Sequence, residues 1–161
     1  MRSLLLISLI AAQTTSFMID GVPFVRQDTN FCGPAALVSV MLYYGETIDQ
    51  HTIGQATYDT KLRGCLLSDL ENFARSRGFD TIADRGTVDQ IKDFLSRKKP
   101  VIVLVDLGWW FVSRPHYLVI IGYTEEGFVA HSGYEESQLY EYEKFMELWA
   151  KIGNTYLLVY R

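Results

Sequence analysis

The sequence predicts one α+β domain in which an antiparallel sheet follows a group of helices. Helical spacing of apolar residues prevails in the first half of the chain, and strand-like apolar runs prevail in the second half. This segregation favours an α+β fold over a doubly wound parallel sheet. With 161 residues, of which 48% are apolar and 21% charged, the chain can bury one core and is too short for two comfortable domains.

The first 16 residues have the three-part form of a secretory leader. Arg2 supplies a positive charge, residues 4–12 form a short apolar run, and residues 13–16 are small or polar. The apolar run is about half as long as the roughly 20 residues that cross a bilayer. We therefore expect residues 1–16 to be a signal peptide and residues 17–161 to be the folded domain of an exported protein. A hydrophobic first helix or strand is the alternative.

Residues 34–44 predict a central helix. Pro34 suits the first turn of a helix, and Gly45 can adopt the left-handed conformation that ends one. Apolar side chains lie on nearly every side of this segment, so we expect the helix to be buried all round.

Two further helices carry capping boxes, in which a serine or threonine is followed three residues later by a glutamate or glutamine. Ser68 and Glu71 open a helix that ends near Gly78, and Thr87 and Gln90 open the next. The remaining patterns predict strands at 101–105, 117–123 and 128–131, then a helix at 141–151 and a strand at 155–160.

Charge and composition exclude several classes of protein. The net charge is −4 and no segment gathers basic residues into a stripe, so nucleic acid is not an expected partner. Two cysteines are too few for a disulfide-built scaffold, and the three histidines lack the spacing of metal ligands. We expect neither a metal nor a cofactor.

Cys32 is the first residue that indicates chemistry. It precedes the Pro34 helix, where unpaired backbone N–H groups and the positive end of the helix dipole stabilise negative charge. A thiol there should ionise more readily than a free one, and the thiolate is the reactive species. Gly33 leaves room for a substrate beside the sulfur, and the Gln27 amide could reach a developing oxyanion. The alternative is a buried cysteine that only packs at the helix start.

His116 is the strongest candidate for a partner of that thiol. It opens the apolar run 117–123, so it should lie at the edge of the sheet that faces a helix end. A cysteine and a histidine far apart in sequence but adjacent in space form the nucleophile and base of thiol hydrolases. The alternative is a strand-end histidine whose ring bonds a loop carbonyl.

Six segments carry a resemblance to a known family. In chain order they are Val22–Gln27, Cys32–Leu37, Tyr43–Gly45, Gly64–Leu66, His116–Tyr123 and the pair Phe145 and Trp149. Together they resemble the peptidase C39 and C39-like family, which are papain-like cysteine peptidases known for processing bacteriocin leaders. The resemblance covers residues 22–160. It implies a papain-like fold with N-terminal helices packed on a C-terminal antiparallel sheet.

The resemblance also implies roles for individual residues. Cys32 would be the nucleophile, His116 the general base and later acid, and Gln27 the oxyanion donor, acting on a peptide or protein substrate without a cofactor. A further expectation comes from the sequence itself: the aromatic residues Trp109 and Trp110, which precede the histidine, could line the substrate cleft or contact a membrane surface. A hydrophobic flap over the core is the other interpretation of that loop.

One departure from the family concerns the third catalytic residue. The family has an aspartate there, and the usual spacing falls near Ser132, whose hydroxyl could accept a hydrogen bond from the His116 ring. His131 lies one residue before that position, so its side chain should face the side of the strand opposite to Ser132. Asp106 could supply a carboxylate from another direction, or the third position could be empty.

The sequence thus predicts an exported C39-like cysteine peptidase, located in the periplasm, outside the cell, or at the membrane through an uncleaved leader. Two alternatives stay open. One is a catalytically silent module of the same fold that binds a peptide for membrane-associated export machinery. The other is a papain-like thiol acyltransferase. No span of bilayer length and no phosphate-binding loop is present, so a peptidase fused to its transporter is not expected.

Overall fold

The computed structural model describes residues 16–161, which contain five helices and nine strands. The helices are α1 (Cys32–Tyr43), α2 (Gln50–Thr57), α3 (Leu67–Ser76), α4 (Val88–Ser96) and α5 (Tyr142–Ala150). The strands are β1 (Phe17–Met18), β2 (Tyr58–Asp59), β3 (Gly64–Cys65), β4 (Asp80–Arg85), β5 (Val101–Asp106), β6 (Pro115–Tyr123), β7 (Gly127–His131), β8 (Gln138–Glu141) and β9 (Thr155–Tyr160). The signal peptide lies outside the described residues except for Ser16, and it stays a prediction.

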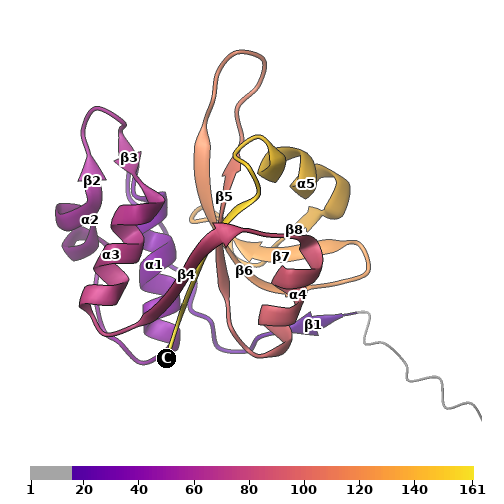
Figure 1. Cartoon of the computed structure of the whole chain (residues 1–161), viewed down its shortest axis with the longest axis horizontal. Coiled ribbons are helices and arrows are strands. Elements are labelled where there is room, and N and C mark those ends of the chain that lie inside the picture. Colours follow the sequence, from indigo (N-terminus) through magenta and orange to yellow (C-terminus); the bar gives the residue numbers. More distant parts are fainter. Residues whose placement is uncertain (1–15) are drawn as a thin grey trace, which may run out of the picture.

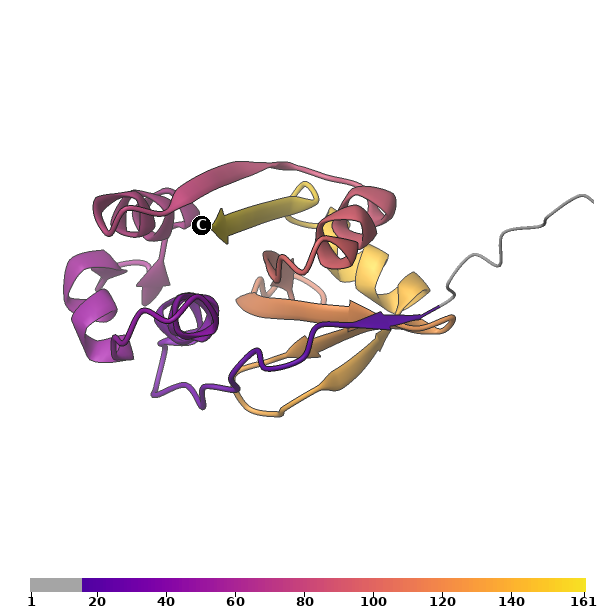
Figure 2. The ribbon, with the colours of Figure 1, turned by 90° about the horizontal axis from the view of Figure 1, so that it is seen from below.

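Seven of the strands form one antiparallel sheet. Six of them follow the order β4-β9-β5-β6-β7-β8, and β1 pairs with the end of β6. The strands β2 and β3 form a separate hairpin. Helices α1 to α3 gather on one side of the central strands, whereas α4 and α5 lie on the other side (Figures 1 and 2). The predicted α+β fold is therefore confirmed. Helix α5 lies before the last strand as predicted, whereas β4, which no pattern predicted, separates α3 from α4.

Helix α1 occupies the centre of the molecule. Every residue from Gly33 to Met41 is buried, as the all-round apolar pattern predicts. The helix begins at Cys32, two residues before its predicted start. Its one buried hydroxyl, Ser39 Oγ, donates a 2.6 Å hydrogen bond to the carbonyl of Pro23. This bond ties the helix to the extended segment that leads to Gln27.

The two predicted capping boxes have different outcomes. At α4 the box is confirmed, because Thr87 Oγ accepts from the Gln90 N–H at 3.2 Å and Gln90 Oε1 accepts from the Thr87 N–H at 3.0 Å. At α3 it is wrong. The helix begins at Leu67, with Leu66 as its N-cap, so Ser68 already lies in the first turn. Leu67 packs against the core, and this packing extends the helix past the residue that would have capped it.

Several elements have no strong sequence signal. Strand β4 is a sheet edge and is exposed along almost its whole length, so it lacks the alternating apolar pattern of a half-buried strand. Helix α2 is short and polar, and it is started by Asp49, whose carboxylate accepts from the N–H groups of His51 and Thr52 at 2.9 Å. No helix within residues 16–161 is long and apolar enough to cross a membrane.

We expect the Leu37→Ala variant to lose about 2–5 kcal/mol of unfolding free energy, because it opens a cavity in the core around the buried helix α1. Leu37 is fully buried, whereas Leu139 on β8 is 41% exposed. The matched control Leu139→Ala should lose less than about 1 kcal/mol. Urea unfolding followed by far-UV circular dichroism measures both values. Equal losses would contradict the central position of α1.

Candidate active site

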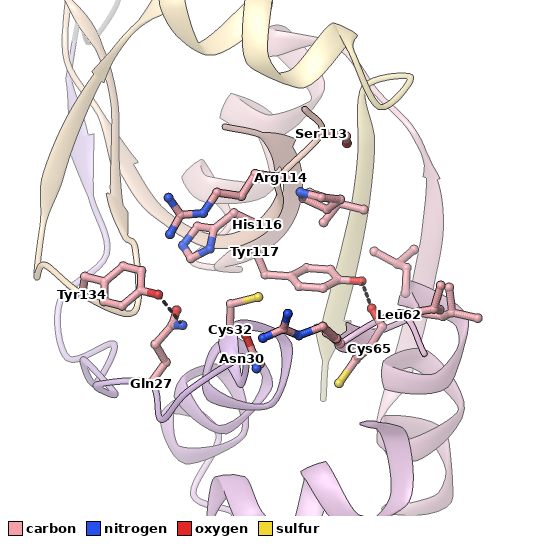
Figure 3. Close-up of a pocket in the computed structure, with 16 residues that line it drawn as sticks. Gln27, Asn30, Cys32, Leu62, Cys65, Ser113, Arg114, His116, Tyr117 and Tyr134 are labelled. Atoms are coloured by element: carbon pink, nitrogen blue, oxygen red, sulfur yellow. Dashed lines mark hydrogen bonds between the residues drawn. The ribbon is translucent and has the colours of Figure 1, made fainter. Parts of the chain in front are cut away.

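A pocket of about 550 Å³ lies between the N-terminus of α1, the β2–β3 hairpin and the start of β6 (Figure 3). Both Cys32 and His116 line it, so the structure brings together the two residues on which the predicted chemistry depends. Among the residues that the structure describes, the lining also includes Arg63 and Arg114 and contains no carboxylate. The pocket is therefore a positively charged cleft on a protein whose net charge is −4.

Cys32 is the first residue of α1 and is half-buried. Phe31 is the N-cap, and no side chain caps the helix start. Burial raises the pKa of the Cys32 thiol, and nearby backbone N–H groups of Tyr117, Gly33 and Cys32 itself oppose this shift without reversing it. The prediction of a readily ionised thiol is therefore wrong for the resting site, because the sulfur is less exposed to water than its place at a helix start suggested.

His116 lies on β6 and is buried. Its Nε2 atom is 2.6 Å from the backbone carbonyl oxygen of Ser132. A carbonyl can only accept, so Nε2 carries the proton and the neutral ring keeps Nδ1 free to accept one. Burial lowers the pKa of His116, and the Ser132 carbonyl opposes that shift. The ring therefore rests in its neutral form at neutral pH.

Within residues 16–161 no hydrogen bond joins the Cys32 sulfur to the His116 ring. Figure 3 shows the sulfur directed toward Tyr117, beside the histidine ring rather than at it. With a raised thiol pKa and a lowered imidazole pKa, the resting site holds a neutral thiol next to a neutral imidazole.

Ser132 contacts His116 through a different atom from the one predicted. Its hydroxyl oxygen accepts from the N–H groups of Glu135 at 2.9 Å and Tyr134 at 3.3 Å, so it closes a turn. The backbone carbonyl of Ser132 is the group that holds the His116 ring. The predicted hydroxyl contact is wrong because the turn already occupies that hydroxyl.

The two other residues considered for the third position do not reach His116. His131 faces the opposite side of β7, as strand alternation predicts, where its Nε2 lies 3.0 Å from the carbonyl oxygen of Val22. The Asp106 carboxylate accepts hydrogen bonds from the N–H groups of Gly108 and Arg114, each at 2.7 Å, and from the Ser113 hydroxyl. These hydrogen bonds hold the Asp106 carboxylate within the hairpin between β5 and β6, away from the His116 ring.

Gln27 lies on the opposite side of Cys32 from Cys65 (Figure 3). Its Nε2 donates to the Tyr134 hydroxyl at 3.1 Å, and its Oε1 is buried without a hydrogen-bond partner. The backbone N–H of Gln27 also donates to the carbonyl of Gly133 at 2.9 Å. Gly133 has a φ of +80°, and a Cβ atom there would collide with Gln27 Oε1. Only glycine lets these two segments approach so closely.

Tyr134 is the residue that sequence reasoning missed. Its ring stacks on the His116 ring with centroids 5.7 Å apart and planes inclined by 7°. The same residue accepts the Gln27 hydrogen bond, so it connects two predicted catalytic side chains. No sequence signal marks it, because its position follows from the turn at Ser132 rather than from a strand or helix period.

Three residues predicted to bind substrate lie outside the pocket lining. A Cβ atom on Gly33 would lie 3.0 Å from Leu70 Cδ1 and 3.2 Å from the Tyr117 ring, so this glycine serves packing inside the fold. Trp109 and Trp110 project into solvent beyond the start of β6, with 80% and 79% of their surfaces exposed. None of the three lines the pocket, so the prediction that they contribute to the cleft is wrong.

The far wall of the pocket contains the second cysteine. Cys65 is free, and its sulfur lies 3.3 Å from the Thr57 hydroxyl. Its backbone carbonyl accepts a 3.0 Å hydrogen bond from the Tyr117 hydroxyl. Tyr117 thus spans the pocket floor between the two cysteines (Figure 3). Within residues 16–161, no three histidine, cysteine or acidic side chains gather in a way that could hold a metal ion.

Solved structures share this fold at low sequence identity. The peptidase domain of Streptococcus ComA, a bi-functional ABC transporter involved in a quorum sensing pathway, is 22% identical with a TM-score of 0.72, covering 87% of this chain and 98% of that one. A putative C39-like peptidase from Bacillus anthracis is 16% identical with a TM-score of 0.75, covering 91% and 98%. A double glycine motif protease from an AMS/PCAT transporter, in complex with the leader peptide, is 17% identical with a TM-score of 0.72, covering 89% and 93%. No curated protein matches the chain.

The architecture, with a cysteine at the start of a buried helix and a histidine on the adjacent strand, is the α+β fold of these C39 peptidase domains. Residues 19–157 match the model of the Peptidase_C39 like family. Because the match covers more than half of the sequence, the chain belongs to this family, and the resemblance seen in the sequence is confirmed.

We expect NMR to find that His116 titrates below the ordinary histidine pKa of about 6.5 and that the neutral ring carries its proton on Nε2. Long-range ¹H–¹⁵N correlation spectra report both properties, and His116→Gln identifies the signals.

The pH dependence of stability follows from the same lowered pKa. The unfolded chain binds the proton that charges the His116 ring more tightly than the folded chain does, so the free energy of unfolding should fall as the pH drops from about 6.5 toward the folded pKa. His116→Gln should flatten that slope. A neutral ring protonated on Nδ1 would contradict the Ser132 contact.

Proposed function

We propose that this protein is a cysteine peptidase that hydrolyses a peptide bond, with Cys32 as the nucleophile and His116 as the general base and acid. One observation carries the proposal. Both residues line the same pocket, and the contact between His116 Nε2 and the Ser132 carbonyl oxygen orients the His116 ring. That orientation leaves Nδ1 as the atom that can take the thiol proton.

The proposed reaction begins when the Cys32 side chain turns toward His116. The Sγ proton passes to Nδ1 as the sulfur attacks the carbonyl carbon of the scissile bond. The imidazolium then gives this proton to the leaving amine, and an acyl-enzyme thioester remains. Water attacks the thioester, His116 takes its proton, and the proton returns to the thiolate as the acid product leaves.

Gln27 is proposed as the oxyanion donor, together with the backbone N–H of Cys32. In the resting site its NH₂ group donates to the Tyr134 hydroxyl, a neutral acceptor. A substrate oxyanion is a stronger acceptor because it is charged. Substrate would therefore draw the Gln27 amide from Tyr134 toward the reacting carbonyl.

The absence of a carboxylate beside His116 bears on rate. A carbonyl dipole fixes the tautomer as a carboxylate does, but it stabilises the imidazolium less because it carries no net charge. Burial lowers the pKa of His116, with a smaller contribution from Arg114, and the Ser132 carbonyl opposes this shift without reversing it. We infer that the transient imidazolium is less stable here than in a site with an aspartate, and that turnover is correspondingly slow.

Two features favour a second candidate function, the binding of a peptide without cleavage. The thiol and imidazole rest neutral and unbonded to each other, and no carboxylate supports the ring. One structural neighbour was solved with the leader peptide bound, so a peptide in the cleft is a reasonable occupant under either function. An acyltransferase would use the same Cys32 and His116 but would deliver the acyl group to an amine.

The leader-like residues 1–16 support a further part of the proposal, namely export to the periplasm or the cell exterior. Retention of the leader would hold the peptidase at the membrane. Membrane-associated export machinery would then be a partner within reach. N-terminal sequencing of the protein isolated from its native cells tests whether the leader is removed.

We expect the full chain to cleave peptides from a mixed library that includes double-glycine leader peptides, with each product carrying a free carboxylate. Mass spectrometry reads both the cut and the product group. Cys32→Ala and His116→Ala should reduce cleavage to background, whereas Cys65→Ser, the matched cysteine control, should keep most of it. Binding without turnover in the wild type would favour the silent module, and amide products would favour the transferase.

Gln27→Ala should lower kcat by about 10²–10³ if the amide stabilises the oxyanion. Its control is Gln55→Ala, because Gln55 is an exposed glutamine on α2 outside the pocket. KM should change much less than kcat, since the lost interaction forms mainly in the transition state. A loss confined to KM would assign Gln27 to substrate binding instead.

A further inference from the structure

The most exposed apolar side chains of the described residues form one continuous group. Trp109, Trp110, Phe111 and Val112 are 80%, 79%, 97% and 71% exposed, and every other exposed large apolar side chain within residues 16–161 is at most 58% exposed. They form the tip of the hairpin between β5 and β6. We call residues 107–114 the aromatic finger.

The base of the aromatic finger is rigidly built. The buried Asp106 carboxylate accepts three hydrogen bonds of 2.7 Å, from the N–H groups of Gly108 and Arg114 and from the Ser113 hydroxyl. A backbone bond of 3.0 Å also joins Leu107 to Arg114, and Lys151 Nζ donates to the Gly108 carbonyl at 3.3 Å. The tip therefore presents its aromatic rings on a fixed support, which lowers the entropy lost when they bind.

A second tip has the same construction. In the β2–β3 hairpin, the Asp59 carboxylate accepts from the N–H groups of Lys61 at 2.7 Å and Leu62 at 2.9 Å. This turn presents Leu62, which is 58% exposed, between Lys61 and Arg63. We call residues 60–63 the basic finger. Figure 1 shows both fingers projecting from the same end of the molecule, at the upper edge of the view.

The two fingers flank the mouth of the candidate active site. Leu62 and Arg63 line the pocket from one side, and Ser113 and Arg114 line it from the other. Whatever the fingers bind therefore lies next to the opening through which a substrate enters.

We propose that the two fingers dock this protein on the interface of a lipid bilayer that contains anionic lipids. Tryptophan is the side chain most typical of the membrane–water interface, because its ring is apolar and its N–H is polar. Four cations stand beside the apolar tips. Lys61 and Arg63 flank Leu62 in the sequence, Arg114 follows the aromatic tip, and Lys151 donates to the Gly108 carbonyl. There they can meet lipid phosphates. The carboxylates of Asp59 and Asp106 are turned into their own hairpins, and Lys151 also pairs with Glu147 at 3.7 Å.

The shape of the tips favours a bilayer over a protein partner. A stable protein interface buries about 800 Å² on each side and is centred on a packed patch. Two separate convex tips, each ending in exposed apolar side chains, instead suit a soft surface into which side chains insert. This docking would place the pocket mouth at the membrane, and it does not require catalysis by Cys32.

Tryptophan fluorescence of the full chain tests the proposal. Trp109 and Trp110 are exposed, the third tryptophan, Trp149, is buried, and residues 1–16 contain none, so insertion of the leader alone cannot move the emission of the finger. The vesicles consist of phosphatidylcholine with about 30% phosphatidylglycerol, which makes their surface anionic. Adding them should shift the tryptophan emission to the blue. Brominated lipids should quench it. Cys32→Ser should behave as the wild type does.

Three variants sharpen the test. Phe111→Ser with Val112→Ser keeps both reporter tryptophans and should lower the vesicle partition coefficient by about tenfold or more. Lys61→Gln with Arg63→Gln should lower binding to the anionic vesicles by about fivefold for each cation, with little change on neutral vesicles. Leu139→Thr, which removes an exposed apolar side chain on β8, should bind as the wild type does.

Either of two results would overturn the proposal: an emission spectrum that vesicles leave unchanged, or a blue shift that persists undiminished in the Phe111→Ser/Val112→Ser variant. Loss of peptidase activity with intact vesicle binding would count against the proposed function alone. The reverse result would count against the docking alone. The two proposals therefore fail separately.

Discussion

The burial of α1 from Gly33 to Met41 fixes where chemistry can occur in this protein. A helix packed on all sides cannot shift along its axis without opening voids, so its N-terminus is held against β6. Cys32 stands at that N-terminus, and His116 stands near the start of β6. The Ser39–Pro23 hydrogen bond extends the same constraint to the segment that carries Gln27. The catalytic candidates are thus positioned by the core rather than by contacts with one another.

The loop after β7 holds the His116 ring in place. The Ser132 hydroxyl closes a turn, the turn directs the Ser132 carbonyl onto His116, and Tyr134 stacks on the same ring while it holds Gln27. Orientation of the imidazole is therefore preserved by neutral groups. What these groups do not supply is a negative charge, and the electrostatic character of the pocket is instead set by two arginines. In this site, neutral groups orient the His116 ring, whereas cationic side chains set the charge of the pocket.

The parts of the fold that could be predicted are those with a strong apolar period. The central helix and the strands that became β5, β6, β7 and β9 fall within a few residues of their predicted bounds, because burial imposes their patterns. Strand β4 and helix α2 escaped prediction because they are exposed or polar. At the site, the pairing of Cys32 with His116 followed from chemistry and resemblance. The Ser132 carbonyl and Tyr134 could not be predicted, since the direction of a carbonyl and the place of a loop ring depend on a turn without a period.

The position of β9 has a consequence for how the molecule is made. This strand is the last in the chain, yet it lies inside the sheet between β4 and β5. Until residues 155–160 are available, β4 has no neighbour to pair with and one edge of β5 stays open. The sheet has long-range pairings throughout, so folding is expected to be late and cooperative rather than progressive. A chain that emerges progressively would therefore lack a complete sheet until residues 155–160 are available, however far the core elements before them have folded.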